Sequence, residues 1–159
     1  MSININFYCA DHCDYIDKED KTVIQKWFKN GQKKYEKWYI DGVYHREDGP
    51  AIQSWFENGQ KEYEEWYLNG VLHREDGPAI QYWFENGQKS FEYWFLNGLN
   101  HREDGPAIQY WFENGQKKRE EWYENGVLHK EDGPVVQNWY KMMNIIENMV
   151  LFIKNGITS

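Results

Sequence analysis

Short runs of aromatic and apolar residues alternate with polar residues along most of the chain, and the runs end at turn signals. Residues 83–87 and 94–98 both consist of two aromatic residues, one further residue and then Asn-Gly. Asn-Gly readily adopts the two positive φ angles of a type I′ turn, so each dipeptide predicts a tight β-hairpin. Asp-Gly-Pro at 104–106 predicts a bend, because proline removes a backbone donor and the aspartate can cap the turn. The pattern therefore predicts two strands in every unit.

The turn signals return with a period of 28 residues. The string HREDGP begins at residues 45, 73 and 101 and returns as HKEDGP at residue 129. Segments 53–80 and 81–108 agree at 21 of 28 positions, and all nine tryptophans fall into two columns, 27/55/83/111/139 and 38/66/94/122. A period of this length indicates stacked repeats whose units cannot bury their apolar faces alone.

The repeat divides the chain into three parts. Residues 1–22 form a degenerate N-terminal cap, residues 23–136 form four 28-residue β repeats, and residues 137–159 form a C-terminal cap. Residues 152–156 echo the hairpin pattern, whereas residues 142–153 also fit a helical stripe. A capping hairpin and a short capping helix therefore both remain open.

The predicted fold is all-β, an antiparallel meander that forms an elongated twisted sheet or a β-solenoid-like array. A two-residue loop at 97–98 places Leu96 opposite Leu99 and Phe95 opposite Asn100. The same register continues to Tyr93 opposite Arg102, and in another unit to Glu65 opposite Arg74, a pair of opposite charges. Both faces of the sheet carry rings, so we expect the twist to fold the tryptophan columns inward.

Composition narrows the class of function. The 159 residues carry a formal net charge of -8 and 18% aromatic residues, with a mean hydropathy of -0.95. An acidic chain without a basic stripe is a poor ligand for nucleic acid or an anionic membrane. No apolar run reaches the roughly 18 residues of a membrane span, and the start lacks a signal-peptide pattern. We expect a cytoplasmic protein, in the host-cell cytoplasm or virion if viral, with its two cysteines reduced.

Several polar columns suggest chemistry, but four near-identical copies favour a structural role over a single catalytic pocket. Adjacent histidines would lie about 10 Å apart, too far to share a metal ion. We expect histidine to stack on the opposite tryptophan, aspartate to cap the Gly-Pro bend, arginine to pair across the strand, and the glutamate column 36/64/92/120 to be a solvated stripe. No catalytic, cofactor-binding or metal-binding residue is predicted. The structural columns are Trp38, Trp66, Trp94, Trp122, His45, His73, His101, His129, Asp48, Asp76, Asp104 and Asp132.

Cys9, His12 and Cys13 have a spacing loosely like half of a zinc site. Two further ligands are not evident, although Asp11 or Asp14 could contribute. A polar capping loop is therefore favoured over a metal site, and no cofactor is expected.

A functional surface is best sought where the repeats differ, because the columns that maintain the fold must stay the same. These positions are Ser54, Tyr82 and Tyr110 in the first strand and Lys37, Glu65, Tyr93 and Glu121 in the second. Alternation places Tyr82 and Tyr93 on the face without tryptophan. Tyrosine supplies a large contact area at low entropic cost, which suits protein recognition. The possible partner-binding residues are thus Tyr82, Tyr93, Tyr110, Glu65 and Glu121, unless these positions are merely tolerant of change.

The aromatic pair, Asn-Gly, short strand and Gly-Pro of residues 23–136, and above all the string HREDGPA, resemble the MORN-type repeat. The similarity is to its variant in bacterial antitoxin-like proteins and giant-virus repeat proteins. The resemblance implies a β-hairpin array used for protein contacts, without chemistry. The ordinary MORN unit is shorter and carries a Tyr-Glu-Gly-rich strand, so lipid binding is not carried over.

Three functions follow as hypotheses. The preferred one is a non-enzymatic scaffold that binds a protein partner through an acidic, aromatic-rich surface. The alternative is an antitoxin or immunity-type inhibitor of one specific protein, which only the resemblance suggests. A metal-dependent or catalytic protein that uses a His/Asp column is the third. The open ends of the sheet could also pair with another copy of the chain.

Overall fold

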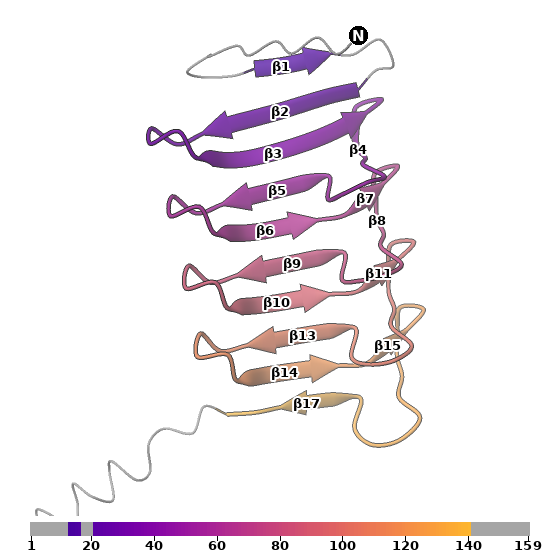
Figure 1. The fold of residues 1–159 in the computed structure, drawn as a ribbon. Coiled ribbons are helices and arrows are strands. Elements are labelled where there is room, and N and C mark those ends of the chain that lie inside the picture. The colour runs from indigo at the N-terminus through magenta and orange to yellow at the C-terminus, as the bar shows by residue number, and fades with distance from the viewer. Residues whose placement is uncertain (1–12, 17–20, 141–159) are drawn as a thin grey trace, which may run out of the picture.

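The computed structural model describes residues 13–16 and 21–140, and within them the fold is all-β and helix-free. One large antiparallel sheet runs the length of the molecule, and small two-stranded hairpins follow its edge (Figure 1). The strands of the large sheet are β1 (Cys13–Ile16), β2 (Lys21–Trp27), β3 (Lys33–Ile40), β5 (Ile52–Trp55), β6 (Lys61–Glu65), β9 (Ile80–Trp83), β10 (Lys89–Tyr93), β13 (Ile108–Trp111), β14 (Lys117–Glu121) and β17 (Val136–Asn138), with β4 (Val43–Tyr44) paired to β3. The three hairpins are β7 (Tyr67–Leu68) with β8 (Val71–Leu72), β11 (Phe95–Leu96) with β12 (Leu99–Asn100), and β15 (Tyr123–Glu124) with β16 (Val127–Leu128).

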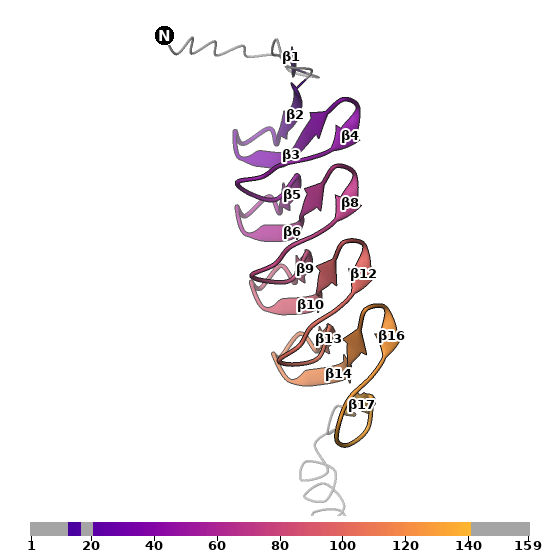
Figure 2. The same cartoon turned by 90° about the vertical axis from the view of Figure 1, so that its right-hand side faces the viewer.

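The large sheet is a meander, because from β2 onward each of its strands pairs with the next one that the chain supplies. We number four units, which begin at Gln25, Gln53, Gln81 and Gln109. Each unit contributes two strands to the large sheet. Figure 2 shows one small hairpin projecting from the same edge in every unit. The predicted elongated, all-β meander is therefore confirmed. The prediction of two strands per unit holds for the large sheet. It did not include the two short strands of the small hairpin.

The two Asn-Gly dipeptides of a unit form different turns. Asn97 and Gly98 have φ angles of 51° and 79°, which confirms the type I′ hairpin. In the other dipeptide, Asn86-Gly87, only Gly87 has a positive φ angle, of 82°. Phe84 N donates to Gln88 O over 2.8 Å. This is a five-residue loop, followed by a β-bulge between Lys89 and Phe91. The type I′ prediction was wrong there. The asparagine Oδ1 accepts from the backbone N–H two residues on, and this bond recurs in all four such loops.

Asn86 fixes its loop and also joins two units. Its Oδ1 accepts from Gln88 N over 2.9 Å, and its Nδ2 donates to the backbone oxygen of Glu113 over 2.9 Å. Asn30 and Asn58 make the same contacts to the loops that follow them. These bonds run along the array and tie successive loops together.

The predicted register holds in the hairpin and fails beyond it. Phe95 pairs with Asn100 and Leu96 with Leu99, as predicted. Tyr93, however, pairs with Ile80 and Ile108 in the large sheet rather than with Arg102. The strand is interrupted at Trp94, whose N–H donates to Ala107 O over 2.7 Å. For the same reason Glu65 does not lie opposite Arg74, and that predicted charge pair was wrong.

The apolar interior is small. Ala51, Ala79 and Ala107 are fully buried, and no large side chain among the described residues is completely enclosed. Trp27 and Trp139 are 41% and 38% exposed, and the other tryptophans are partly exposed. The indole nitrogens of Trp66 and Trp94 are buried, so the expectation that the tryptophan columns fold inward holds only in part. The helix-or-hairpin question at 142–153 lies outside the described residues.

Candidate functional site

Strand alternation gives the large sheet two faces of different chemistry. The carboxylate face carries the glutamate column Glu36, Glu64, Glu92 and Glu120 with the tryptophans and the arginines of HREDGP. The tyrosine face carries a row across the strands at Tyr35, Ser54, Tyr63, Tyr82, Phe91, Tyr110 and Arg119, and beside it a second row that includes Lys37, Glu65, Tyr93 and Glu121.

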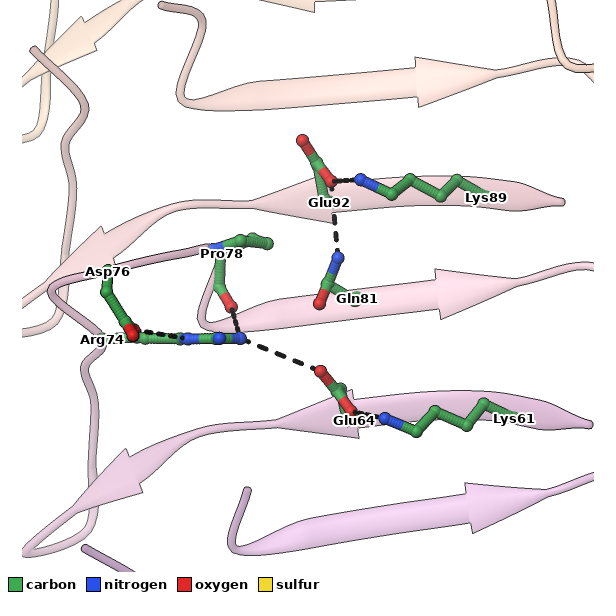
Figure 3. Close-up of polar contacts among 8 residues, drawn as sticks. All are labelled: Lys61, Glu64, Arg74, Asp76, Pro78, Gln81, Lys89 and Glu92. Carbon is green, nitrogen blue, oxygen red and sulfur yellow. Dashed lines mark hydrogen bonds and ion pairs between the residues drawn. The ribbon is translucent and has the colours of Figure 1, made fainter. Parts of the chain in front are cut away.

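The glutamates of the carboxylate face are buried. Glu36, Glu64, Glu92 and Glu120 are only 4 to 6% exposed, so the predicted solvated stripe was wrong. Lys61 Nζ lies 2.5 Å from Glu64 Oε2, and Lys89 Nζ lies 2.6 Å from Glu92 Oε2 (Figure 3). Residues three apart on a regular strand point to opposite faces, and the bulge between them turns the lysine to the side of its glutamate. Each buried charge is thereby paired.

Hydrogen bonding decides the ionisation of Glu36, the first residue of this column. Burial by itself raises the pKa of Glu36. Hydrogen bonds from Lys33, Trp38 and Gln25, together with the charge of Lys33, outweigh the burial and leave the pKa below its ordinary value of 4.5. The Trp38 Nε1 donates to Glu36 Oε1 over 2.7 Å. The carboxylate therefore stays charged in the folded protein at neutral pH.

Arginine lies over the tryptophans of the second column in the first three units, and Lys130 takes its place over Trp122. The Cζ of Arg74 lies 3.9 Å from the ring centroid of Trp66, and the Cζ of Arg102 lies 4.0 Å from that of Trp94. The predicted histidine stacking was wrong, because the interruption of the strand at tryptophan brings the longer arginine side chain over the ring. Cation–π contacts of this kind stabilise the array and keep water from the ring face.

The same arginine determines the role of the aspartate column. Arg74 Nε donates to Asp76 Oδ1 over 3.0 Å, and Arg74 Nη1 donates to Pro78 O over 3.4 Å (Figure 3). The hydrogen bond and charge of Arg74 lower the pKa of Asp76. Asp76 therefore holds the arginine in place, which differs from the predicted capping of the Gly-Pro bend.

The histidines connect neighbouring units. His73 Nδ1 accepts from Asn97 N over 3.2 Å, and His45 and His101 accept in the same way from Asn69 and Asn125 over 3.0 and 3.1 Å. Each histidine thus serves the type I′ turn of the next unit.

Within residues 13–16 and 21–140, no three His, Cys, Asp or Glu residues lie close enough together to hold a metal ion. Cys9 and His12, like the side chain of Cys13, lie outside the described residues. A hollow of about 370 Å³ lies between two hairpins, lined by Arg46, Trp66 and Arg74 among others. Its arginines already pair with Asp48 and Asp76, so little charge is left for a ligand.

The tyrosine face carries a continuous stack of rings. Tyr63 and Tyr82 stack with centroids 4.9 Å apart and planes inclined by 15°, and Tyr82 and Phe91 stack at 4.3 Å and 18°. Phe91 and Tyr110 continue the row at 5.9 Å in a tilted arrangement. These spacings match the distance between strands, so the rings stand side by side on the sheet.

Hydroxyl groups and carboxylates complete this face. Tyr82 Oη donates to Glu65 Oε1 over 3.2 Å, and Tyr67 Oη donates to Glu65 Oε2 over 3.1 Å. The hydroxyls of Tyr93 and Tyr110 bond to each other. Burial and then the charge and hydrogen bond of Glu65 raise the pKa of Tyr67 to about 12 and raise that of Tyr82 further. The face therefore has an ordered pattern of phenols and negative charge.

The candidate strand positions at which the repeats differ lie on this one face. Tyr82, Tyr93, Tyr110, Glu65 and Glu121 are partly exposed, Lys37 lies beside them, and Ser54 is buried under Glu62. The predicted placement of Tyr82 and Tyr93 away from the tryptophans is confirmed. Sequence reasoning missed the ring partners Tyr63 and Phe91, which the cross-strand register would have located.

No protein-family model, curated protein or solved structure matches the chain. The resemblance of the 28-residue unit to the MORN-type repeat therefore stays a prediction. Within the part of the chain that the structure describes, there is no helix of the length and apolar character that crossing a bilayer requires.

Proposed function

We propose that this protein is a non-enzymatic repeat scaffold that binds another protein through its tyrosine face. One observation carries the proposal: two strand columns that vary between units, 54/82/110 and 65/93/121, project from the same face of the large sheet. The carboxylate face, in contrast, repeats nearly the same contacts in every unit. Conservation of one face between units fits a structural role, and variation of the other fits recognition.

The chemistry of the tyrosine face suits a protein partner. Tyrosine combines a large apolar surface with a hydroxyl group, and it loses little entropy when it is fixed. Stacking already holds Tyr63, Tyr82 and Phe91 in place. A partner would therefore meet a surface that is ordered before binding, which lowers the cost of association.

The charged groups of the carboxylate face do not favour catalysis. Glu64 and Glu92 are each paired with a lysine, and Asp76 is paired with Arg74. A general acid or base needs a titratable group that can reach a substrate. These groups are instead satisfied by one another in every unit.

The test is affinity capture from cells that encode the protein, with partners identified by mass spectrometry. Replacement of Tyr82, Tyr93 and Tyr110 by alanine should abolish capture of a specific partner, and so should Glu65→Lys, which leaves the rings in place. Tyr140→Ala and Glu85→Lys are matched controls, because Tyr140 is 89% exposed beyond β17 and Glu85 lies in an exposed loop. Circular dichroism would confirm that each variant is folded. Unchanged capture by both folded tyrosine-face variants would refute the proposal.

A further inference from the structure

Two carboxylates of the tyrosine face, Glu62 and Glu65, differ from the buried glutamates of the carboxylate face in their partners. Glu65 accepts hydrogen bonds only from the phenols Tyr67 and Tyr82, and Glu62 accepts one from Ser54. Among the described residues, neither forms an ion pair with a lysine or arginine. The glutamates of the carboxylate face, by comparison, each have a lysine within 2.6 Å.

The fourth unit shows what the second unit lacks. Glu121 occupies the same column as Glu65, and Arg119 occupies the column of Tyr63, since each pair is separated by two 28-residue periods. Arg119 Nε donates to Glu121 Oε1 over 2.6 Å, while Tyr123 Oη donates to Glu121 Oε2 over 3.1 Å. Arg119 also lies beside Tyr110 in the neighbouring strand. An arginine therefore already fits against a ring and a glutamate on this face.

In the second unit the phenol contact is kept and the arginine is absent. Tyr67 bonds to Glu65 as Tyr123 bonds to Glu121, over the same 3.1 Å. The charges of Glu65 and Glu62 also raise the pKa of Tyr63, after the larger effect of burial. The local potential at Tyr63 and Tyr82 is thus negative, and within residues 21–140 no lysine or arginine forms an ion pair with Glu62 or Glu65.

We propose that Glu62 and Glu65, flanked by Tyr63 and Tyr82, form a binding site for an arginine side chain of the protein partner. This inference rests on the proposed function and specifies its chemistry. The guanidinium would pair with Glu65 as Arg119 pairs with Glu121, but from the solvent side of the face, because Tyr63 fills the column of Arg119 in this unit. Arginine is favoured over lysine because its planar fork can bond a carboxylate through two donors and pack against an aromatic ring.

Synthetic peptides test the site without knowledge of the partner. The full-length protein would be titrated with a Gly-Ser peptide that contains arginines, and with peptides in which citrulline or lysine replaces them. Citrulline keeps the shape of arginine and removes its charge. The arginine peptide should bind at least tenfold more tightly than the citrulline peptide, and Glu65→Gln should remove that preference. Glu85→Gln, the matched control in an exposed loop, should retain it.

A second variant supplies the arginine from within the chain. Tyr63→Arg places an arginine two residues before Glu65, as Arg119 stands before Glu121, so the site should fill itself. This variant should lose arginine-peptide binding while it keeps its β-sheet circular dichroism spectrum. Equal binding of arginine and citrulline peptides, or full binding by Tyr63→Arg, would overturn the inference. If partner capture still depended on the three tyrosines, the proposed function would stand while this inference failed.

Discussion

The replacement Glu64→Gln tests whether the buried glutamate column stabilises the array. Glutamine keeps the size of the side chain and removes its charge. In the folded protein Glu64 is 5% exposed, with Lys61 Nζ at 2.5 Å and Arg74 Nη1 at 3.8 Å. A hydrogen bond to a charged group contributes roughly 1.5 to 3 kcal/mol when it is well buried. The Lys61 side chain is 47% exposed, so solvent recovers part of that amount.

We therefore expect Glu64→Gln to lower the free energy of unfolding by about 1 to 2 kcal/mol. Glu85→Gln is the matched control, because Glu85 lies in an exposed loop. Its effect should stay within about 0.5 kcal/mol. Urea unfolding followed by tryptophan fluorescence measures both values. A cost for Glu85→Gln equal to that for Glu64→Gln would refute the reasoning.

Two further predictions concern the loops and the phenols. Asn86→Asp removes the Nδ2 donor to Glu113 O and should lower the free energy of unfolding by about 0.5 to 1.5 kcal/mol. Asn114→Asp should lower it less, because Asn114 Nδ2 bonds within its own loop. Equal urea midpoints for the two variants would contradict the inter-unit role of Asn86. The raised pKa of Tyr67, about 12, means that the folded protein keeps this proton after the unfolded chain has lost it at its ordinary value of 10.0, so stability should fall as the pH rises from 10 toward 12. Glu65→Gln should shift the phenolate absorbance titration of Tyr67 and Tyr82 to lower pH, and an unshifted titration would argue against the assigned charge effect.

Local turn chemistry accounts for what the sequence could predict of the fold. Asn97-Gly98 requires a type I′ hairpin, and its register with Phe95 and Asn100 follows from the two-residue loop. The second dipeptide, Asn86-Gly87, has the same letters but forms a different turn, in which Asn86 Oδ1 accepts from Gln88 N. The contact of Asn86 Nδ2 with Glu113 O spans 27 residues, so a local rule could not predict it.

The glutamate column shows why part of the surface could not be predicted. A regular strand would place Lys61 and Glu64 on opposite faces, so strand alternation gives no sign that this glutamate is paired and buried. The bulge between Ser54 and Trp55 on one strand and Lys61 and Tyr63 on the other brings the two charges together. The bulge follows directly after the five-residue loop. Because the turn type of this loop was predicted wrongly, the burial of the whole glutamate column was predicted wrongly too. Alternation beyond the bulge was unaffected, so the face of Tyr82 and Tyr93 was predicted correctly.

The central claim is that one face of the sheet maintains the fold and the other binds a partner. Oxidative footprinting of the protein with and without its captured partner tests this claim most directly, because tyrosine and tryptophan side chains report on separate faces. The account predicts that binding protects Tyr82, Tyr93 and Tyr110 while the oxidation rates of Trp66 and Trp94 stay unchanged. Protection of the tryptophans with unprotected tyrosines would contradict it.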